Sequence, residues 1–370
     1  KIGTDQHNKF DTMTMDCWND RVYYEGKEFP AGQFAAEILN FAGVIHDPLL
    51  ERITVLTALV DDLSTAEKSK RHDIAAQLKP LLHDTVSWLY TCPPFCYCES
   101  QGAYEDLEHA LSEERLDRDY EEGEAHLPYL ALSSCEPILR ILVAIYNFCL
   151  LIRAFEKKYL RRAKRRNADA FAKAAHECFD EDDSFLNLLE QMPFGGVEEF
   201  FSYPRIITGF NYFQDENDEE KWKTAQRVIC KRAIDFYVFD LMNGLHHGHA
   251  PSQCQGCGRY FLTTNGHTPK YCDGVAPQDN RYTCRQYGAM KHQKEQNKQH
   301  PVYRLFNTRT DTIRKHHQRG KISDDLRREA LYLAGSYRDK ALMDNDYAAD
   351  GYARDMELEH IYAEAEKRLK

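Results

Sequence analysis

The sequence of 370 residues has no run of about 20 uninterrupted apolar residues, the length that a membrane-spanning helix needs. The nearest candidate runs from Ile141 to Ile152, but it is shorter and contains Asn147, so we expect a buried core helix there. No charged-then-apolar secretory leader follows Lys1. These absences predict a soluble protein that has no membrane partner and is located in the cytoplasm.

Signatures of catalysis are also missing. The sequence has no glycine-rich nucleotide-binding loop, no nucleophile motif and no pair of carboxylates at an informative spacing. His316 and His317, together with Asn307 and Asp311, allow a metal-dependent nuclease as an alternative, but the strand–turn–helix pattern of such a site is not predicted around them. We therefore predict no catalytic residue, and we expect a protein that is not an enzyme.

The composition is that of a globular protein, with 42% apolar, 12% aromatic and 29% charged residues and a net charge of −11. The charge is distributed unevenly. From Pro251 to Lys321, thirteen Lys or Arg face four Asp or Glu, a local balance of +9, so the total of −11 leaves −20 for the remainder. Such asymmetry indicates an interaction with a partner.

Apolar residues in the first 250 positions recur at helical spacing and predict a mainly α fold. This acidic region is a candidate for sensing a signal or binding a protein partner. We expect three units: a helical domain over 1–250, a zinc finger over 251–300 and C-terminal helices over 301–370. The predicted helices of the first unit are 35–44, 49–63, 74–89, one starting at Pro137 and continuing through Phe155 to Arg166, and 222–245.

Twelve cysteines in so long a chain are too dilute for a disulfide scaffold. Cys149, Cys178 and Cys230 lie in apolar contexts and are expected to be small buried residues. Four others lie in a polar segment rich in turn residues, which has too little apolar material to form a core without a metal. They are Cys254, Cys257, Cys272 and Cys284, and we predict that they bind one zinc ion.

The local pattern around these cysteines predicts a treble-clef-like unit. Gly256 and Gly258 allow the tight turn of a Cys-x-x-Cys knuckle, from which residues 260–262 leave as a strand. Asn265-Gly266 is a hairpin turn signal, and residues 270–271 are expected to return as the second strand. A helix should then begin near Cys284 and end before His300-Pro301.

Several alternatives stay open at this point. The four cysteines could be buried thiols without a metal, and His267 could replace one ligand. Two further groups could hold a metal, although a helix C-terminus and a plain loop explain them as well: the histidines 246, 247 and 249, and the cysteines 92, 96 and 98. The basic run from Lys157 to Arg166 could bind phosphates, or it could be the exposed end of an apolar helix.

The segment resembles a known type of zinc finger. Cys-x-x-Cys-Gly-Arg-Tyr-Phe at 254–261, Lys-Tyr-Cys at 270–272 and Cys-Arg at 284–285 are similar to the CGNR-type zinc finger of bacterial regulators. They are more similar still to an uncharacterised bacterial family, over about the last third of the chain. The resemblance implies a zinc-binding, DNA-associated protein without enzyme activity. However, Cys284 is followed by Arg-Gln-Tyr instead of Gly-Asn-Arg, so only the metal ligands carry over.

The favoured function is nucleic-acid binding with a regulatory role, to DNA more than to RNA, through the basic region 251–321. Lys291, Lys294 and Lys298 are aligned on one side of the predicted helix, and with Arg285 they are the predicted phosphate contacts. The alternative is a protein-interaction scaffold in which the basic region docks on an acidic surface. Because four thiolates fill the coordination of zinc, we expect a structural ion in either case. Helices are predicted to follow over 302–317, after Ser323, and over 348–369.

Overall fold

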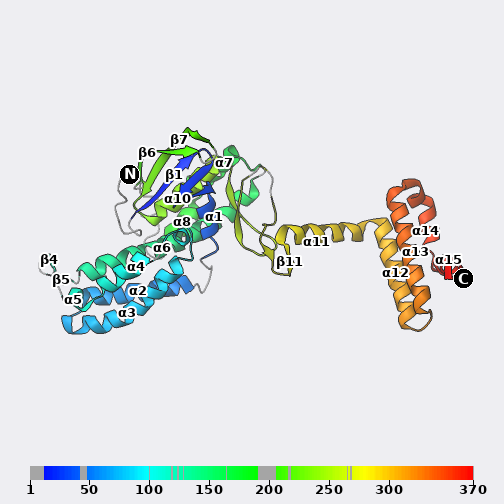
Figure 1. Ribbon diagram of the computed structural model, residues 1–370, viewed down its shortest axis with the longest axis horizontal. Coiled ribbons are helices and arrows are strands. Elements are labelled where there is room, and N and C mark those ends of the chain that lie inside the picture. The colour runs from blue at the N-terminus through cyan, green and yellow to red at the C-terminus, as the bar shows by residue number, and fades with distance from the viewer. Residues whose placement is uncertain are drawn as a thin grey trace. The chain divides into compact units, whose positions relative to one another are not determined.

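The computed structural model describes residues 12–41, 48–99, 101–117, 120–122, 125–127, 129–163, 165–190, 206–215, 218–264, 266 and 269–369. Contacts divide the chain into two compact units, residues 1–270 and 271–370. The finer division at residues 250 and 300 stays a prediction. Figure 1 follows the chain from blue at the N-terminus to red at the C-terminus.

A five-stranded antiparallel sheet is part of the first unit, with strand order β3-β2-β1-β7-β6. Its two halves are far apart in the sequence, because β1 pairs with β7, so that Met15 lies opposite Val228. The side chains of Met13, Met15, Val228 and Cys230 face the core. The strands are β1 (Met13–Trp18), β2 (Arg21–Tyr24), β3 (Lys27–Pro30), β6 (Ile206–Asp215) and β7 (Asp218–Cys230).

The prediction of a mainly α fold with a treble-clef unit is wrong, because this sheet and three two-stranded sheets make the fold mixed α/β. The helix expected over 222–245 is divided between two elements. Residues up to Cys230 belong to β7, and α10 begins only at Ala233. The β-branched pair Val228-Ile229 also fits a helical pattern, but it pairs with β1 more than 200 positions earlier in the sequence, which local spacing cannot reveal.

Helices cover the inner face of the sheet and form one apolar core with it. The central helix α6 packs against α2, α4 and α10, and α10 also packs against α1 and α7. Pro137 lies inside α6 and not in its first turn, because α6 begins at Tyr129. The helices of this unit are α1 (Gln33–Ile38), α2 (Pro48–Thr65), α3 (Lys68–Leu89), α4 (Gln101–Ala110), α5 (Glu113–Leu116), α6 (Tyr129–Lys158), α7 (Ala168–Phe179), α8 (Asp183–Glu190) and α10 (Ala233–His246), with 3-10 turns η1 (Phe95–Tyr97) and η2 (Leu160–Arg162).

Part of α6 is apolar enough to be considered as a membrane span. The stretch Ala131–Arg162 has the length and composition to cross a membrane, but 67% of its most apolar window is buried inside the protein. A mostly buried helix of this kind is compatible with a soluble protein. Cys149, Cys178 and Cys230 are fully buried in the same core, which confirms the prediction made for these three cysteines.

Three small sheets complete the strands: β4 (Tyr120–Glu122) with β5 (Ala125–Leu127), β8 (Ala250–Gln253) with β9 (Tyr260–Thr263), and β10 (Val275–Ala276) with β11 (Asp279–Thr283). The second unit continues with helices and has its own apolar core around Ile313, Leu333 and Ile361. The predicted N-cap Ser323 accepts a hydrogen bond from the N–H of Leu326, at 3.2 Å. The helices are α11 (Cys284–Gln299), α12 (Pro301–Gln318), α13 (Asp324–Met343), the π-helix η3 (Tyr347–Gly351), α14 (Tyr352–Asp355) and α15 (Leu358–Leu369).

Candidate metal centre

The first two cysteines lie in the tight turn between β8 and β9. The N–H of Cys254 donates to the carbonyl oxygen of Arg259 at 2.8 Å, and the N–H of Gly258 donates to that of Cys254 at 2.9 Å. Gly258 has a φ of 75°, a left-handed conformation that favours glycine. The N–H of Gly256 points at the sulfur of Cys254, at 3.3 Å. This is the tight turn that the Cys-x-x-Cys-Gly pattern predicts.

The partner of the strand that leaves the knuckle differs from the prediction. Strand β9 was expected to pair with residues 270–271, but it pairs with β8, which precedes the knuckle. In this register Gln253 lies opposite Tyr260, so the hairpin places Cys254 directly at its end. The turn signal Asn265-Gly266 lies only partly within the described residues, because Asn265 is outside them. His267, the alternative ligand, is also outside the described residues.

Backbone hydrogen bonds tie the second pair of cysteines together. The N–H of Cys284 donates to the carbonyl oxygen of Gly274 at 2.8 Å, and the N–H of Arg285 donates to that of Cys272 at 3.1 Å. Cys284 is the first residue of α11, as predicted. The loop that carries Cys272 is therefore held against the N-terminus of the helix that carries Cys284.

A reciprocal pair of hydrogen bonds fixes the start of α11. The N–H of Thr283 donates to Oε1 of Gln286 at 2.9 Å, and the N–H of Gln286 donates to Oγ1 of Thr283 at 3.2 Å. This is a capping box, in which the N-cap and the third helical residue satisfy each other's backbone N–H. It places Cys284 in the first turn. The Thr-x-x-Gln pattern at 283–286 was the sequence signal for it.

A close approach between Tyr271 and α11 also positions the site. A Cβ atom at Gly288 would lie 2.4 Å from the ring of Tyr271, so only glycine allows this contact. Tyr271 directly precedes Cys272, and Gly288 is one turn after Cys284. Sequence reasoning missed Gly288, because the sequence does not show that the ring of Tyr271 packs against this position of the helix.

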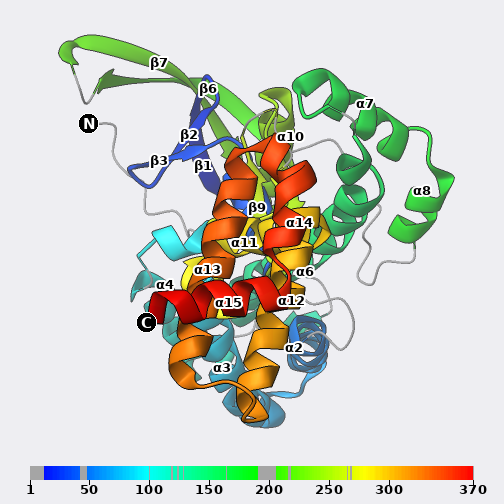
Figure 2. The same cartoon turned by 90° about the vertical axis from the view of Figure 1, so that its right-hand side faces the viewer.

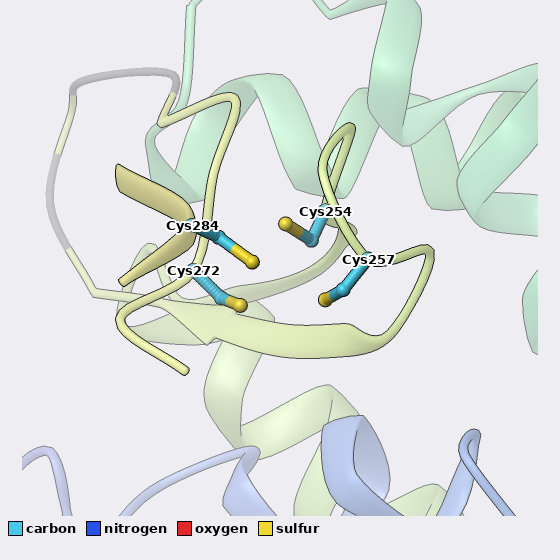
Figure 3. A group of neighbouring side chains, drawn as sticks. All are labelled: Cys254, Cys257, Cys272 and Cys284. Carbon is cyan, nitrogen blue, oxygen red and sulfur yellow. The ribbon is translucent and has the colours of Figure 1, made fainter. Parts of the chain in front are cut away.

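The four Sγ atoms of Cys254, Cys257, Cys272 and Cys284 all lie within 4.8 Å of one another, and Figure 3 shows them pointing toward a common centre. Three of the cysteines are buried and Cys257 is partly exposed. Four thiolates at the Zn–S distance of about 2.3 Å would be separated by about 3.8 Å in a tetrahedron, so small shifts of the sulfurs would fit them to the ion. These four residues could therefore hold a metal ion.

Within the described part of the chain, no other group of three or more His, Cys, Asp or Glu brings its ligand atoms together in this way. The two groups of metal-binding candidates have structural partners instead. Nδ1 of the buried His249 bonds to the carbonyl oxygen of Ala31 at 3.0 Å. The sulfur of Cys92 donates to a helix carbonyl, and that of Cys98 lies 3.2 Å from the hydroxyl of Tyr24. The nuclease candidate His316 bonds to the hydroxyl of Tyr362 at 2.8 Å.

The predicted phosphate contacts are on the helix that begins at the cysteine cluster. Lys291 and Lys294 are exposed on α11. Arg285 is also exposed, but its guanidinium forms an ion pair with Asp273 at 2.9 Å. The backbone of Lys298 is in α11, whereas its side chain lies outside the described residues.

Three of the seven cations in the alternative basic segment, from Lys157 to Arg166, contact neighbouring side chains, whereas those of Lys157, Arg162 and Arg165 are exposed. Lys158 pairs with Asp182 at 2.5 Å, and Arg161 pairs with the buried Glu156 at 2.8 Å. The buried Arg166 donates to Oγ1 of Thr263 at 3.2 Å. These contacts fix the end of α6 and η2 to neighbouring elements, and phosphate binding by the exposed cations of the run stays a prediction.

Comparison with known proteins gives one match. Residues 202–368 are similar to a family of unknown function, DUF6076. The match covers under half of the chain and includes the cysteine cluster and every helix that follows it. No curated protein and no solved structure matches the chain. The resemblance to an uncharacterised family is thus supported, whereas the one to the CGNR-type finger is not.

Proposed function

We propose that Cys254, Cys257, Cys272 and Cys284 bind one Zn²⁺ and that this ion is structural. The proposal is supported by four convergent thiols, the ligand set that structural zinc prefers, and by the absence of a fifth described side chain that reaches them. With four protein ligands, no coordination position is left for a catalytic water. A reducing compartment such as the cytoplasm would keep the thiols available for the metal.

The zinc unit would serve to present a basic helix to nucleic acid, with DNA preferred over RNA. The observation that carries this proposal is that α11 begins on a metal ligand and has exposed Lys291 and Lys294 three residues apart. Its sixteen residues contain four Lys or Arg and only one acidic residue, Glu295. Because phosphates attract such a surface whatever the base sequence, the helix is suited to contact a nucleic-acid backbone.

The test compares two double variants with the same change of charge. Lys291→Ala/Lys294→Ala removes the proposed contacts, whereas Lys70→Ala/Lys173→Ala removes two exposed lysines of α3 and α7. Binding of fluorescent duplex DNA, single-stranded DNA and RNA is measured by anisotropy between about 50 and 200 mM salt. We expect the first variant to lower the slope of log K against log salt by about 1.8 for duplex DNA, and the control to leave it unchanged.

Two results would contradict the proposal. Equal weakening by both double variants would mean that only the total charge matters. If the zinc-loaded protein binds none of the three nucleic acids at low salt, the basic helix has another partner and the protein is an interaction scaffold. Removal of zinc by a chelator should weaken binding to DNA as much as the loss of both lysines does, because α11 loses the support of Cys284.

A further inference from the structure

An unusual set of exposed aromatic side chains is present far from the cysteines in the sequence. Phe210 and Tyr212 of β6 are 73% and 65% exposed, and Trp222 of β7 is 67% exposed. The hairpin register pairs Tyr212 with Thr224 and Gln214 with Trp222, so all three aromatic residues lie on the same face. Figure 2 shows the β6–β7 hairpin extending past β1.

This face is the continuation of the one that packs on the core. Val228 and Cys230, at the base of the hairpin, belong to the same face as Trp222 and are fully buried. Strand β1 pairs with β7 only from Gln226 to Cys230, so the outer half of the hairpin is a two-stranded ribbon in the described part of the chain. A two-stranded ribbon is only marginally stable by itself in water. The aromatic face of the hairpin thus extends beyond the apolar core, which covers only the part near Val228 and Cys230.

Strand β6 is also an open edge as far as the described residues show. It is the last strand of the sheet, and its residues from Ile206 to Gln214 include no charge and no proline. Proteins normally protect long edge strands with charged residues or proline, because the unpaired N–H and C=O groups otherwise pair with another strand. Gly209, in the middle of the strand, has open space where a Cβ would be, so no described side chain packs over that position on the opposite face of the strand.

We propose that β6 pairs antiparallel with β6 of a second copy of this chain and joins two hairpins into one continuous sheet. A strand is complementary to its own copy under two-fold symmetry. Because side chains alternate between the two faces of a strand, this pairing puts the aromatic faces of both copies on the same side of the joined sheet. In the register that places Asn211 on the two-fold axis, Phe210 of each copy lies opposite Tyr212 of the other. Aromatic cross-strand pairs of this kind stabilise sheets.

Charge favours the antiparallel arrangement and a protein partner. Five of the six residues 215–220 at the hairpin tip are acidic, whereas the exposed Lys231 follows the base. Antiparallel pairing places the two acidic tips at opposite ends of the joined strands, whereas parallel pairing would bring them together. The alternating residues of the aromatic face, from Ile206 to Gln214 and from Trp222 to Cys230, include no Lys or Arg. Stacking of nucleic-acid bases usually needs such cations nearby, so a second copy fits this face better.

The experiment measures the mass of the full-length protein by sedimentation equilibrium, with zinc present throughout. We expect the native chain to be a dimer at about 100 μM and to dissociate on dilution. Phe210→Lys/Tyr212→Lys places like charges opposite each other across the edge, and we expect it to weaken the dimer by at least about tenfold. The matched control is Met343→Lys, which changes a residue of α13 that is 89% exposed, and it should leave the dimer intact.

Hydrogen exchange of the native chain gives a second test that needs no variant. Amides of β6 should exchange more slowly above the dissociation constant than below it, while amides of β2 and β3 should not change. A monomer at every concentration, or a double variant that remains a dimer, would overturn the proposal. A monomer whose β6 amides are protected at every dilution would show that another segment of the same chain covers the edge. The result is independent of the cysteine cluster, because none of these residues belongs to it.

Discussion

At the scale of single residues, the most unusual environment is that of Asp240. This carboxylate of α10 is fully buried and accepts hydrogen bonds from the N–H groups of Gly32 and Ala35, both at 2.9 Å. It therefore caps the start of α1 from a position about 200 residues later in the sequence. Gly32 has a φ of 89°, and a Cβ added to it would lie 3.2 Å from the Cα of Gly244. The two segments therefore approach too closely for larger residues.

The Asp240 carboxyl should make stability depend on pH. Burial raises its pKa to about 7, although the hydrogen bonds from Ala35 and Gly32 act in the opposite direction. The folded protein then binds this proton more tightly than the unfolded chain does, so the contribution to the free energy of unfolding is full below pH 4 and is lost as the pH rises through 7. Asp240→Asn removes the titration. We expect native stability to fall by about 1–3 kcal/mol more than that of the variant between pH 5 and 8.

Urea denaturation of both proteins at each pH checks this prediction. The variant replaces one of the two carboxyl oxygens that accept from Gly32 and Ala35 with an NH2 group, so it should be less stable at pH 5, and the gap between the two proteins should narrow toward pH 8. Parallel stability curves would mean that Asp240 keeps an ordinary pKa in the folded state.

At the scale of elements, the helix caps differ in what they support. The capping box of Thr283 and Gln286 holds the start of α11 at Cys284, whereas Ser323 caps α13 with the same chemistry at a distance from the cysteines in the sequence. Thr283→Ala should cost about 1 kcal/mol, which corresponds to about fivefold weaker zinc binding, because the helix forms together with the metal site. Ser323→Ala removes a similar cap and should leave zinc affinity unchanged. Competition with a chromophoric zinc chelator measures both affinities.

The elements that sequence reasoning predicted correctly are those with local signals. The knuckle, the start of α11 at Cys284 and the cap at Ser323 follow from residues within four positions of one another. The five-stranded sheet does not, because β1 and β7 are paired across more than 200 residues and their apolar spacing also suits a helix. The pairing of β9 with β8 was missed for a related reason: the Asn265-Gly266 signal pointed to a partner further along the chain. The grouping of the four cysteines could be predicted from the knuckle with its glycines and from the polar, turn-rich segment, but Gly288 could not.

At the scale of the whole molecule, the two compact units have separate apolar cores. One core surrounds Phe34, Phe148 and Tyr237, and the other surrounds Ile313, Leu333 and Ile361. Among the described residues of 251–300, none is a buried member of either core, and only Tyr260 packs against the first one. The part after residue 270 therefore depends on its own hydrogen bonds and on whatever holds the four cysteines together, whereas β9 is also held by α1 and by hydrogen bonds between Asn40 and Tyr260.

This distribution predicts a local response to metal removal. A chelator should release protection of the amides in β10, β11 and the first turns of α11, because this segment buries too little apolar surface to stay folded without the proposed zinc. The amides of α6 and α13 should keep their protection, because their cores do not include the site. Hydrogen exchange followed by mass spectrometry, with and without chelator, resolves the two responses. Cys257→Ser should reproduce the pattern seen with the chelator. The control Cys96→Ser, which changes an exposed cysteine, should not. Loss of protection in α6 or α13 would mean that zinc supports the whole fold, and unchanged protection in β10 and β11 would mean that the cysteines need no metal.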